Sequence, residues 1–409
     1  MMKSEIANWN NISGIDKVGF YIHIPFCPHI CPYCDFVKTS KFSKSDVKFY
    51  LQSCKEQLDT LLNLIPEQIR SATLYFGGGT PGILSSDCFA VFIDHLKKKF
   101  ALEEITLETN PFTNNQKRLQ EYASVGIDRI TLGAQSLCPE TLKFLGRKHT
   151  TKDVFQTIAW AQEAGIETIQ VDLIYGLGKQ IRTISLEDEI KSLSNAKVTG
   201  ISAYALTIEE RTLFAKKSSI VSDEAAENDY ECLVKTCKSV GFTQIETSNF
   251  SYRPARHNHI YWLGYPYLGI GTGAHGLLFP TVDHPYGQRY KVGQTPKELS
   301  PGNDLLSFTA HDELTKNFTL QFEPPRTKKQ YVEEMIFTLL RTPLGISRSW
   351  LNEVTNSDAL FDKILSNAKV QRGIQEQKIC LTNDRLTISP LEKIRGDAWA
   401  ADIIFMISP

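Results

Sequence analysis

Three cysteines lie within eight positions of one another in the segment HIPFCPHICPYCDF, residues 23–36. Cys27, Cys31 and Cys34 follow the spacing C-x3-C-x2-C, and no fourth cysteine comes close behind them. Three thiolates on a tight loop can bind three corners of an iron–sulfur cube, whereas a standard [4Fe–4S] cluster takes four cysteines. The spacing therefore predicts a cluster whose fourth iron is left open for a ligand from outside the loop.

Two other interpretations of these cysteines compete with a cluster. A structural zinc site normally closes at four ligands, but His29 lies inside the loop and would strain it, and the chain has no second C-x2-C or H-x3-H pair. Three unrelated buried cysteines are the plainest interpretation, and their spacing next to a predicted strand end disfavours it.

The elements that must position this loop alternate between strand-like and helix-like segments. Short β-branched or aromatic runs occupy residues 18–26, 72–77, 104–109, 129–135, 168–176 and 200–208, and stretches with helical periodicity separate them. The helix expected over 150–165 begins with a capping box, Thr150 and Asp153, and ends at Gly165. Strands and helices that alternate at this spacing predict βα units and a parallel sheet. Six strands indicate an α/β fold with a partial (β/α)6 TIM-like barrel.

Polar and glycine-rich stretches follow the predicted strands. The second strand ends in FGGGTP, and Glu108, Gln135 and Asp172 stand at the ends of the next three, with Arg147 twelve residues after Gln135. Chemistry in such a sheet is located at the C-terminal ends of the strands, and glycines let a backbone approach a ligand closely. Singly, the glycines indicate a tight turn and each polar residue a solvated charge or a cap. Together they predict a ligand site.

The alternation stops near residue 250. Residues 252–310 are rich in Gly, Pro, His and Tyr and indicate a long ordered loop or a strand extension over the sheet. A new helix is expected from about 326, followed by a hairpin with an Asn-Asp turn in KICLTNDRLTIS. We therefore predict a small α+β C-terminal domain. The expected division is an N-terminal extension (1–17), a core (18–250), a segment covering the barrel (251–325) and the C-terminal domain (326–409).

Composition excludes several classes of protein. The net charge of −1 does not favour sequence-independent binding to nucleic acid, and no apolar run reaches the roughly 20 residues of a membrane helix. The N-terminal segment MMKSEIANWNNISG has no apolar core of the signal-peptide kind. Nine cysteines without a regular framework predict reduced thiols and a cytoplasmic location. The six cysteines outside the loop are expected to be small buried hydrophobes: Cys54, Cys88, Cys138, Cys232, Cys237 and Cys380.

The cysteine loop together with the glycine run resembles the radical S-adenosylmethionine (SAM) superfamily. The resemblance implies that SAM chelates the open iron through its amino and carboxylate groups, and that an electron from the reduced cluster cleaves the sulfonium bond to a 5′-deoxyadenosyl radical. It places Gly78, Gly79, Thr80 and Tyr21 near SAM. Arg147 is then expected to pair with the SAM carboxylate, Gln135 and Asp172 to bind the ribose hydroxyls, and Glu108 to bind the ammonium or the ribose.

The order and spacing of these residues resemble the subgroup that contains the oxygen-independent coproporphyrinogen III oxidase. The oxidase pattern has a fourth cysteine two positions after the third, where this chain has Phe36. The segment HNHIYW instead resembles the HNxxYW signature of the HemW heme chaperones, carried here by His257, Asn258, Tyr261 and Trp262. The resemblance covers residues 18 to about 345, and the C-terminal domain more loosely.

This second resemblance implies heme as cargo, heme-accepting proteins and an electron donor as partners, and oxidase activity as the alternative function. Imidazole is the commonest axial ligand of heme, so His257 or His259 is the expected ligand, with Tyr265 and Tyr267 adding aromatic surface. The plainer interpretation is that these side chains pack the segment onto the barrel mouth, with His257 bonded to backbone. His275 is a further candidate for building the site, and the sequence is compatible with a homodimer.

Overall fold

A computed structural model describes residues 15–178, 181–216, 222–293 and 319–407. Most of the predicted N-terminal extension, and the part of the barrel-covering segment between 294 and 318, lie outside the described residues. In the part that is described, no helix is both long and apolar enough to cross a membrane.

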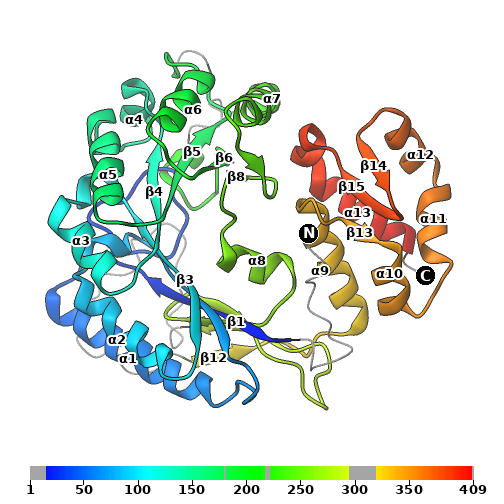
Figure 1. Ribbon diagram of the computed structural model, residues 1–409, viewed down its shortest axis with the longest axis horizontal. Helices are drawn as coiled ribbons and strands as arrows, with labels where there is room; N and C mark the ends of the chain where they lie inside the picture. The colour runs from blue at the N-terminus through cyan, green and yellow to red at the C-terminus, as the bar shows by residue number, and fades with distance from the viewer. Residues whose placement is uncertain (1–14, 179–180, 217–221, 294–318, 408–409) are drawn as a thin grey trace.

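All six predicted strands are present and form one parallel array. Neighbours in the sequence pair in order and in parallel. The strands are β1 (Lys17–Ile24), β2 (Ser71–Gly78), β3 (Ala101–Thr109), β4 (Arg129–Gln135), β5 (Thr168–Tyr175) and β6 (Gly200–Ala205). Figure 1 shows the helices of the first half of the chain arranged around the outside of this array. The partial TIM-like barrel is therefore confirmed.

The outer helices are amphipathic and close the βα units. They are α1 (Lys44–Leu62), α2 (Ser86–Lys97), α3 (Gln116–Ser124), α4 (Pro139–Phe144), α5 (Thr151–Glu163), α6 (Leu186–Asn195) and α7 (Asp223–Ser239). Helix α5 begins at the capping box of Thr150 and Asp153, and Gly165 follows it with φ of 80°. Both ends are as predicted. A capping box supplies hydrogen-bond partners to the first amides of the helix, and glycine tolerates the left-handed backbone conformation that follows its last turn.

The two faces of the strands differ in chemistry. Phe20, Leu74 and Phe76 are fully buried between the sheet and its helices, where the hydrophobic core lies. The opposite face of the same strands lines the interior of the barrel, and a Cβ on Gly77 would lie 2.8 Å from the Tyr75 ring and 2.9 Å from the Tyr21 ring. The interior therefore carries tyrosines and carboxylates, and it is the face on which a polar ligand can bind.

Further strands extend both edges of this sheet. On the β1 side, β9 (Tyr267–Ile270) pairs in parallel with β1, and β10 (His275–Leu277), β11 (Arg289–Gly293) and β12 (Thr319–Phe322) follow antiparallel. On the β6 side lie β8 (Asn249–Ser251) and β7 (Thr243–Gln244). In its described part, residues 252–293, the predicted loop or strand extension is a short helix, α8 (Arg256–Trp262), followed by strands that extend the sheet.

The C-terminal part is a small α+β unit around an antiparallel sheet of order β13-β15-β14. Its elements are α9 (Lys328–Arg341), β13 (Ile346–Ser347), α10 (Arg348–Thr355), α11 (Leu360–Ser366), α12 (Ala368–Gln375), β14 (Ile379–Thr382), β15 (Arg385–Ile388), a 3-10 turn (Pro390–Arg395) and α13 (Gly396–Ile407). The predicted hairpin turn is present, with positive φ at Asn383 and Asp384, as a two-residue type I′ turn requires.

One prediction about the scattered cysteines is wrong. Cys54, Cys138 and Cys237 are buried as expected, whereas Cys88 and Cys232 are only half-buried and Cys380 is exposed. Cys380 lies on β14, the outer strand of the small sheet, so one face of its strand meets solvent.

Candidate functional site

The cysteine loop is fastened to the C-terminal ends of β1 and β2. The Cys27 amide donates to the Thr39 carbonyl at 2.9 Å, and the Thr39 amide to Pro25 at 2.7 Å. The Thr80 amide of the glycine segment donates to the Phe26 carbonyl at 2.9 Å, and its hydroxyl lies 3.1 Å from Cys27 Sγ. The cysteine loop and the glycine segment therefore form one rigid wall.

This wall borders a cavity of about 570 Å³, which we call the cluster cavity. Most of the residues predicted from the strand ends line it: Cys27, Cys31, Cys34, Gly78, Gly79, Thr80, Glu108, Gln135, Arg147 and Asp172. Tyr21 is not among the lining residues; it packs on the Tyr75 ring at 5.9 Å, and its hydroxyl lies 3.0 Å from His23 Nδ1. The tertiary structure thus brings residues from five strand ends to one place.

The three thiols line one part of the cluster cavity and are the donor type that iron–sulfur clusters use. Among the described residues, no three His, Cys, Asp or Glu side chains converge to hold one ion, whereas the cysteines of a cubane each bind a different iron. Arg147 Nη1 donates to Cys31 Sγ at 3.3 Å, so a cationic side chain lies beside one of the three predicted cluster ligands. Burial raises the pKa of the Cys27 and Cys34 thiols.

Two buried polar atoms of the cluster cavity have no hydrogen-bond partner among the described residues: Arg147 Nε and Asp172 Oδ1. The other nitrogens of Arg147 are used, because Nη2 donates to the Gly133 carbonyl at 2.6 Å and to the Asn110 side chain. Buried polar groups without partners are costly, so each indicates a ligand group. A donor suits a carboxylate and an acceptor suits a hydroxyl, and SAM carries both groups.

Asp172 has its proton affinity set by its surroundings. Burial, together with the neighbouring Glu108 carboxylate, raises the pKa of Asp172 to about 8. The carboxyl group is therefore largely protonated at neutral pH, and a ligand that donates hydroxyl protons to it competes with that proton.

Glu108 links the barrel interior to the glycine segment. Its Oε1 accepts the Tyr75 hydroxyl proton at 2.8 Å and its Oε2 accepts the Gly78 amide at 2.9 Å. Gly78 has φ of 117°, and a Cβ there would lie 2.5 Å from the His23 ring. Only glycine fits this position, so the carboxylate and the amide approach each other without a side chain between them.

Several residues that line the cavity had no predicted role, and three of them are Tyr75, Asn110 and Tyr204. The sequence carries a signal for the first two of these residues. Tyr75 lies two positions before Gly77 and so shares the interior face of β2 with it, and Asn110 directly follows the third strand end. Tyr204 stands at the end of the sixth strand, where a role in the cavity follows from its position alone.

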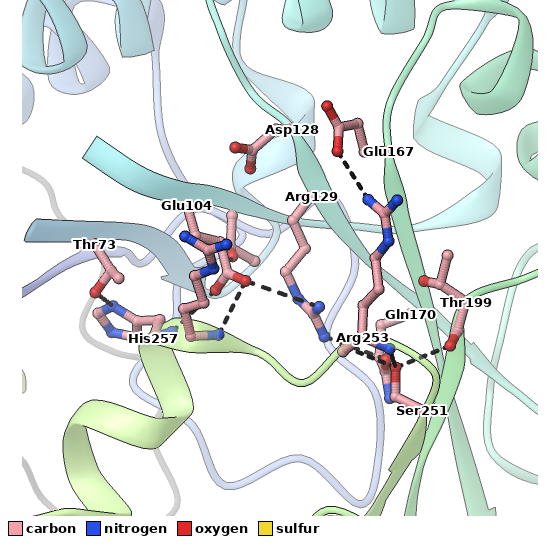
Figure 2. Close-up of polar contacts among 12 residues, drawn as sticks. Thr73, Glu104, Asp128, Arg129, Glu167, Gln170, Thr199, Ser251, Arg253 and His257 are labelled. Carbon is pink, nitrogen blue, oxygen red and sulfur yellow. Dashed lines mark hydrogen bonds and ion pairs between the residues drawn. The ribbon is translucent and has the colours of Figure 1, made fainter. Parts of the chain in front are cut away.

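The HNxxYW residues lie at the other end of the barrel. Helix α8 contacts β1, β2 and β3, and its partners Thr73 and Glu104 are near the starts of their strands. Figure 2 shows His257 pointing to Thr73, with the first turn of α8 beside Glu104. The segment therefore closes the N-terminal end of the barrel, whereas the cysteines lie at the C-terminal end.

His257 is 1% exposed, and both ring nitrogens are hydrogen-bonded, to the Thr73 hydroxyl and the Tyr261 hydroxyl, each at 2.8 Å. Binding of heme iron there would require one of these bonds to break. Asn258, His259 and Trp262 line a separate small cavity, and the Arg341 guanidinium lies over the Trp262 ring at 5.3 Å. His275 is exposed on β10 and does not line the cluster cavity. The plainer interpretation expected His257 to be bonded to backbone, whereas its ring nitrogens bond to the side chains of Thr73 and Tyr261.

Comparisons with known proteins show which chains this one is similar to. Residues 21–186 match the model of the radical SAM superfamily. The chain is 35% identical over 279 residues to the heme chaperone HemW of Haemophilus influenzae, covering 65% of this chain and 72% of that protein. It is 30% identical over 381 residues to HemW of Bacillus subtilis, covering 89% and 94%. The fold is similar to that of the coproporphyrinogen III oxidase HemN from Escherichia coli, with a TM-score of 0.71, 16% identity and coverage of 96% and 90%.

Proposed function

This chain belongs to the radical SAM superfamily and, within it, to the HemW family, and on that premise we propose that it is a heme chaperone. It holds a [4Fe–4S] cluster and SAM, binds heme and passes it to acceptor proteins. The observation that carries the cofactor part is the cluster cavity, where three thiols share one space with the unpartnered Arg147 Nε and Asp172 Oδ1. The relatives' names carry the heme part.

In this proposal the side chains of the cluster cavity have separate tasks. Cys27, Cys31 and Cys34 hold the cluster. Arg147 faces the SAM carboxylate with the donor that has no partner, and Asp172 faces a hydroxyl with its unpartnered oxygen. When bound, the reduced cluster and SAM supply one-electron cleavage of the sulfonium bond.

The mouth of the cluster cavity is the surface that suits heme best. Phe36 is 67% exposed, Tyr204 47% and Phe112 38%, and all three line the cavity. Aromatic side chains at this exposure are the kind of surface that a flat apolar ring covers. This support is independent of His257, whose ring is enclosed at the other end of the barrel.

Oxidase activity on coproporphyrinogen III is the second candidate function. The fold similarity to HemN is compatible with it, but Phe36 stands where the oxidase pattern has its fourth cysteine. Phe36 is exposed and, being a phenylalanine, supplies no thiol at that position. We therefore favour the chaperone, with heme-accepting proteins and an electron donor as its partners. A cytoplasmic location and a homodimer are part of the same proposal.

Anaerobic reconstitution with iron and sulfide tests this proposal in two assays. The wild-type chain is expected to take up about four irons and to give a Soret band on titration with hemin at one heme per chain. Cys31→Ala is expected to lose the iron and keep the Soret band, and Cys88→Ala serves as the matched control. Incubation with SAM, reductant and coproporphyrinogen III is expected to give no protoporphyrinogen IX; its formation would establish the oxidase instead.

A second pair of variants tests the heme surface. Phe36→Ser is expected to weaken hemin binding by roughly threefold or more, because it removes most of one exposed aromatic face. Phe405→Ser is the control, since Phe405 is 83% exposed on α13, away from the cluster cavity. Equal hemin affinity of the two variants would exclude the cavity mouth as the heme surface.

A further inference from the structure

Helix α8 is anchored to the N-terminal end of the barrel by a buried carboxylate. Glu104 of β3 accepts the backbone amides of Arg256 and His257, each at 3.0 Å, where the first turn of a helix lacks partners of its own. Arg129 lies 4.0 Å from the same carboxylate and donates to Gln170 at 3.2 Å (Figure 2). These buried contacts fix the position of α8 relative to the strands.

The His257 side chain is held on three sides. Nδ1 bonds to the Thr73 hydroxyl and Nε2 to the Tyr261 hydroxyl, and the Tyr75 ring packs beside the imidazole with 5.1 Å between ring centroids. A ring whose two nitrogens are both bonded cannot rotate without losing a hydrogen bond. His257 therefore presents a fixed surface to Tyr75.

Tyr75 reaches from His257 to the other end of the barrel interior. Its hydroxyl donates to Glu108 Oε1 at 2.8 Å, and Glu108 Oε2 accepts the Gly78 amide at 2.9 Å. Tyr75, Glu108 and Gly78 all line the cluster cavity, whereas His257 does not. A continuous series of contacts thus joins α8 to the glycine segment: His257 to Tyr75, Tyr75 to Glu108, and Glu108 to Gly78.

We infer that His257 is a positioning residue for the SAM site, acting through Tyr75 and Glu108 on the amide of Gly78. The inference rests on the proposed function, since it needs SAM as the ligand of the cluster cavity. It gives the His of the HNxxYW segment a role in holding SAM from a distance, and the role requires no contact between His257 and heme.

The test measures SAM affinity on anaerobically reconstituted protein, together with the electron paramagnetic resonance signal of the reduced cluster with and without SAM. His257→Ala is expected to bind SAM roughly five- to tenfold more weakly and to keep full iron content and hemin binding. Tyr75→Phe removes only the hydroxyl and is expected to weaken SAM binding to a similar extent. The double variant is expected to be no weaker than Tyr75→Phe alone, because both changes act on one series of contacts.

Controls separate positioning from general damage. His275→Ala removes an exposed imidazole outside the cluster cavity and is expected to leave SAM affinity and the cluster signal unchanged. Thr73→Val removes one hydrogen bond of His257 with little change of shape, and is expected to weaken SAM binding two- to threefold even if His257→Ala does not fold. Iron content and the thermal unfolding midpoint are recorded for every variant.

Three outcomes would overturn the inference. SAM affinity of His257→Ala equal to that of the wild type is one, and strictly additive effects in the double variant are another. Loss of hemin binding with unchanged SAM affinity is the third, and it would establish His257 as a heme ligand. Failure of the proposed function is seen separately, because the wild-type chain with a full cluster would then itself bind no SAM.

Discussion

Asp172 shows how burial decides what a single carboxyl group can do. The sequence placed it at a strand end, but only its enclosure beside Glu108 raises the pKa to about 8. Its unpartnered oxygen faces the cluster cavity. The side chain therefore changes its charge at pH values close to neutral.

This pKa gives a testable pH dependence of SAM binding. A carboxylate accepts hydroxyl hydrogen bonds better than a protonated carboxyl group, so SAM binding is expected to release the Asp172 proton. SAM affinity should therefore rise as pH increases from 6.5 to 8.5, by roughly three- to tenfold. The measurement is the dissociation constant across this range for the wild type and for Asp172→Asn.

The SAM amino group also titrates near this range, but its titration affects the wild type and Asp172→Asn equally. The difference between them isolates Asp172. Parallel curves for wild type and variant would show that Asp172 does not exchange a proton on binding.

At the scale of single elements, the neutral side chain of His257 holds α8 against the barrel through its two hydrogen bonds. Burial lowers the pKa of His257 to about 3, far below the 6.5 of an exposed histidine. In the unfolded chain His257 takes up a proton below pH 6.5, whereas the folded state leaves it neutral. The stability contribution is therefore complete above pH 6.5 and is lost as pH falls.

The expected result is a fall in the free energy of unfolding of up to about 1.4 kcal/mol per pH unit below pH 6.5 from this residue. Urea unfolding of wild type and His257→Phe between pH 4.5 and 7 measures it. His257→Phe should have a smaller slope, even though its stability at pH 7 is also reduced. Identical slopes would mean that His257 is protonated in the folded protein.

Helix α9 depends on a lysine from outside its own sequence. Lys393, in the 3-10 turn at Pro390–Arg395, is buried and donates to the carbonyls of Leu340, Arg341 and Thr342 at 3.0 to 3.3 Å. The last carbonyls of a helix have no partner within the helix. Lys393 supplies these partners where solvent cannot reach.

Lys393→Met is expected to destabilise the protein by about 2 kcal/mol, because the side chain keeps its length and loses all its donors. The free energy of unfolding from urea titration is the measurement. Lys363→Met, at an exposed position on α11, is the control and should be nearly neutral. A loss below about 0.5 kcal/mol for Lys393→Met would show that other donors replace it.

At the scale of the whole molecule, the C-terminal unit packs on the barrel through two kinds of charged contact. Arg341 of α9 lies 3.7 Å from Glu246, which is 2% exposed, and Arg395 pairs with the exposed Glu227 of α7 at 2.5 Å. Buried residues of both parts belong to one continuous hydrophobic core. The interface therefore resembles the interior of a domain, with one ion pair enclosed and one at the rim.

Because Glu246 is buried and Glu227 is exposed, the same substitution is expected to reduce the free energy of unfolding by different amounts at the two positions. Glu246→Gln is expected to cost about 2 kcal/mol, because the buried carboxylate that accepts the Ser248 amide at 3.0 Å loses its charge, and Arg341 keeps only its pair with the exposed Asp397. Glu227→Gln should cost well under 1 kcal/mol, because solvent screens that pair. Chemical unfolding of both variants tests this, and equal losses would contradict the assignment of burial.

Local features of the sequence determined the main part of this fold. Alternating strands and helices, the capping box at Thr150 and the Asn383-Asp384 turn are present as predicted, because each depends on neighbours within a few residues. The cluster cavity was likewise predictable, because parallel strands bring their C-terminal ends to one side. Cys27, Glu108 and Asp172 come together for that reason.

Only the tertiary structure decided which end of the barrel each segment occupies. The HNxxYW segment was expected over the barrel mouth, and α8 closes the opposite end, because the return of the chain after β6 depends on long-range packing that no local pattern records. The same holds for the pKa of Asp172 and for the exposure of Cys380. Burial is a property of the assembled molecule, since it depends on what other segments place around a side chain.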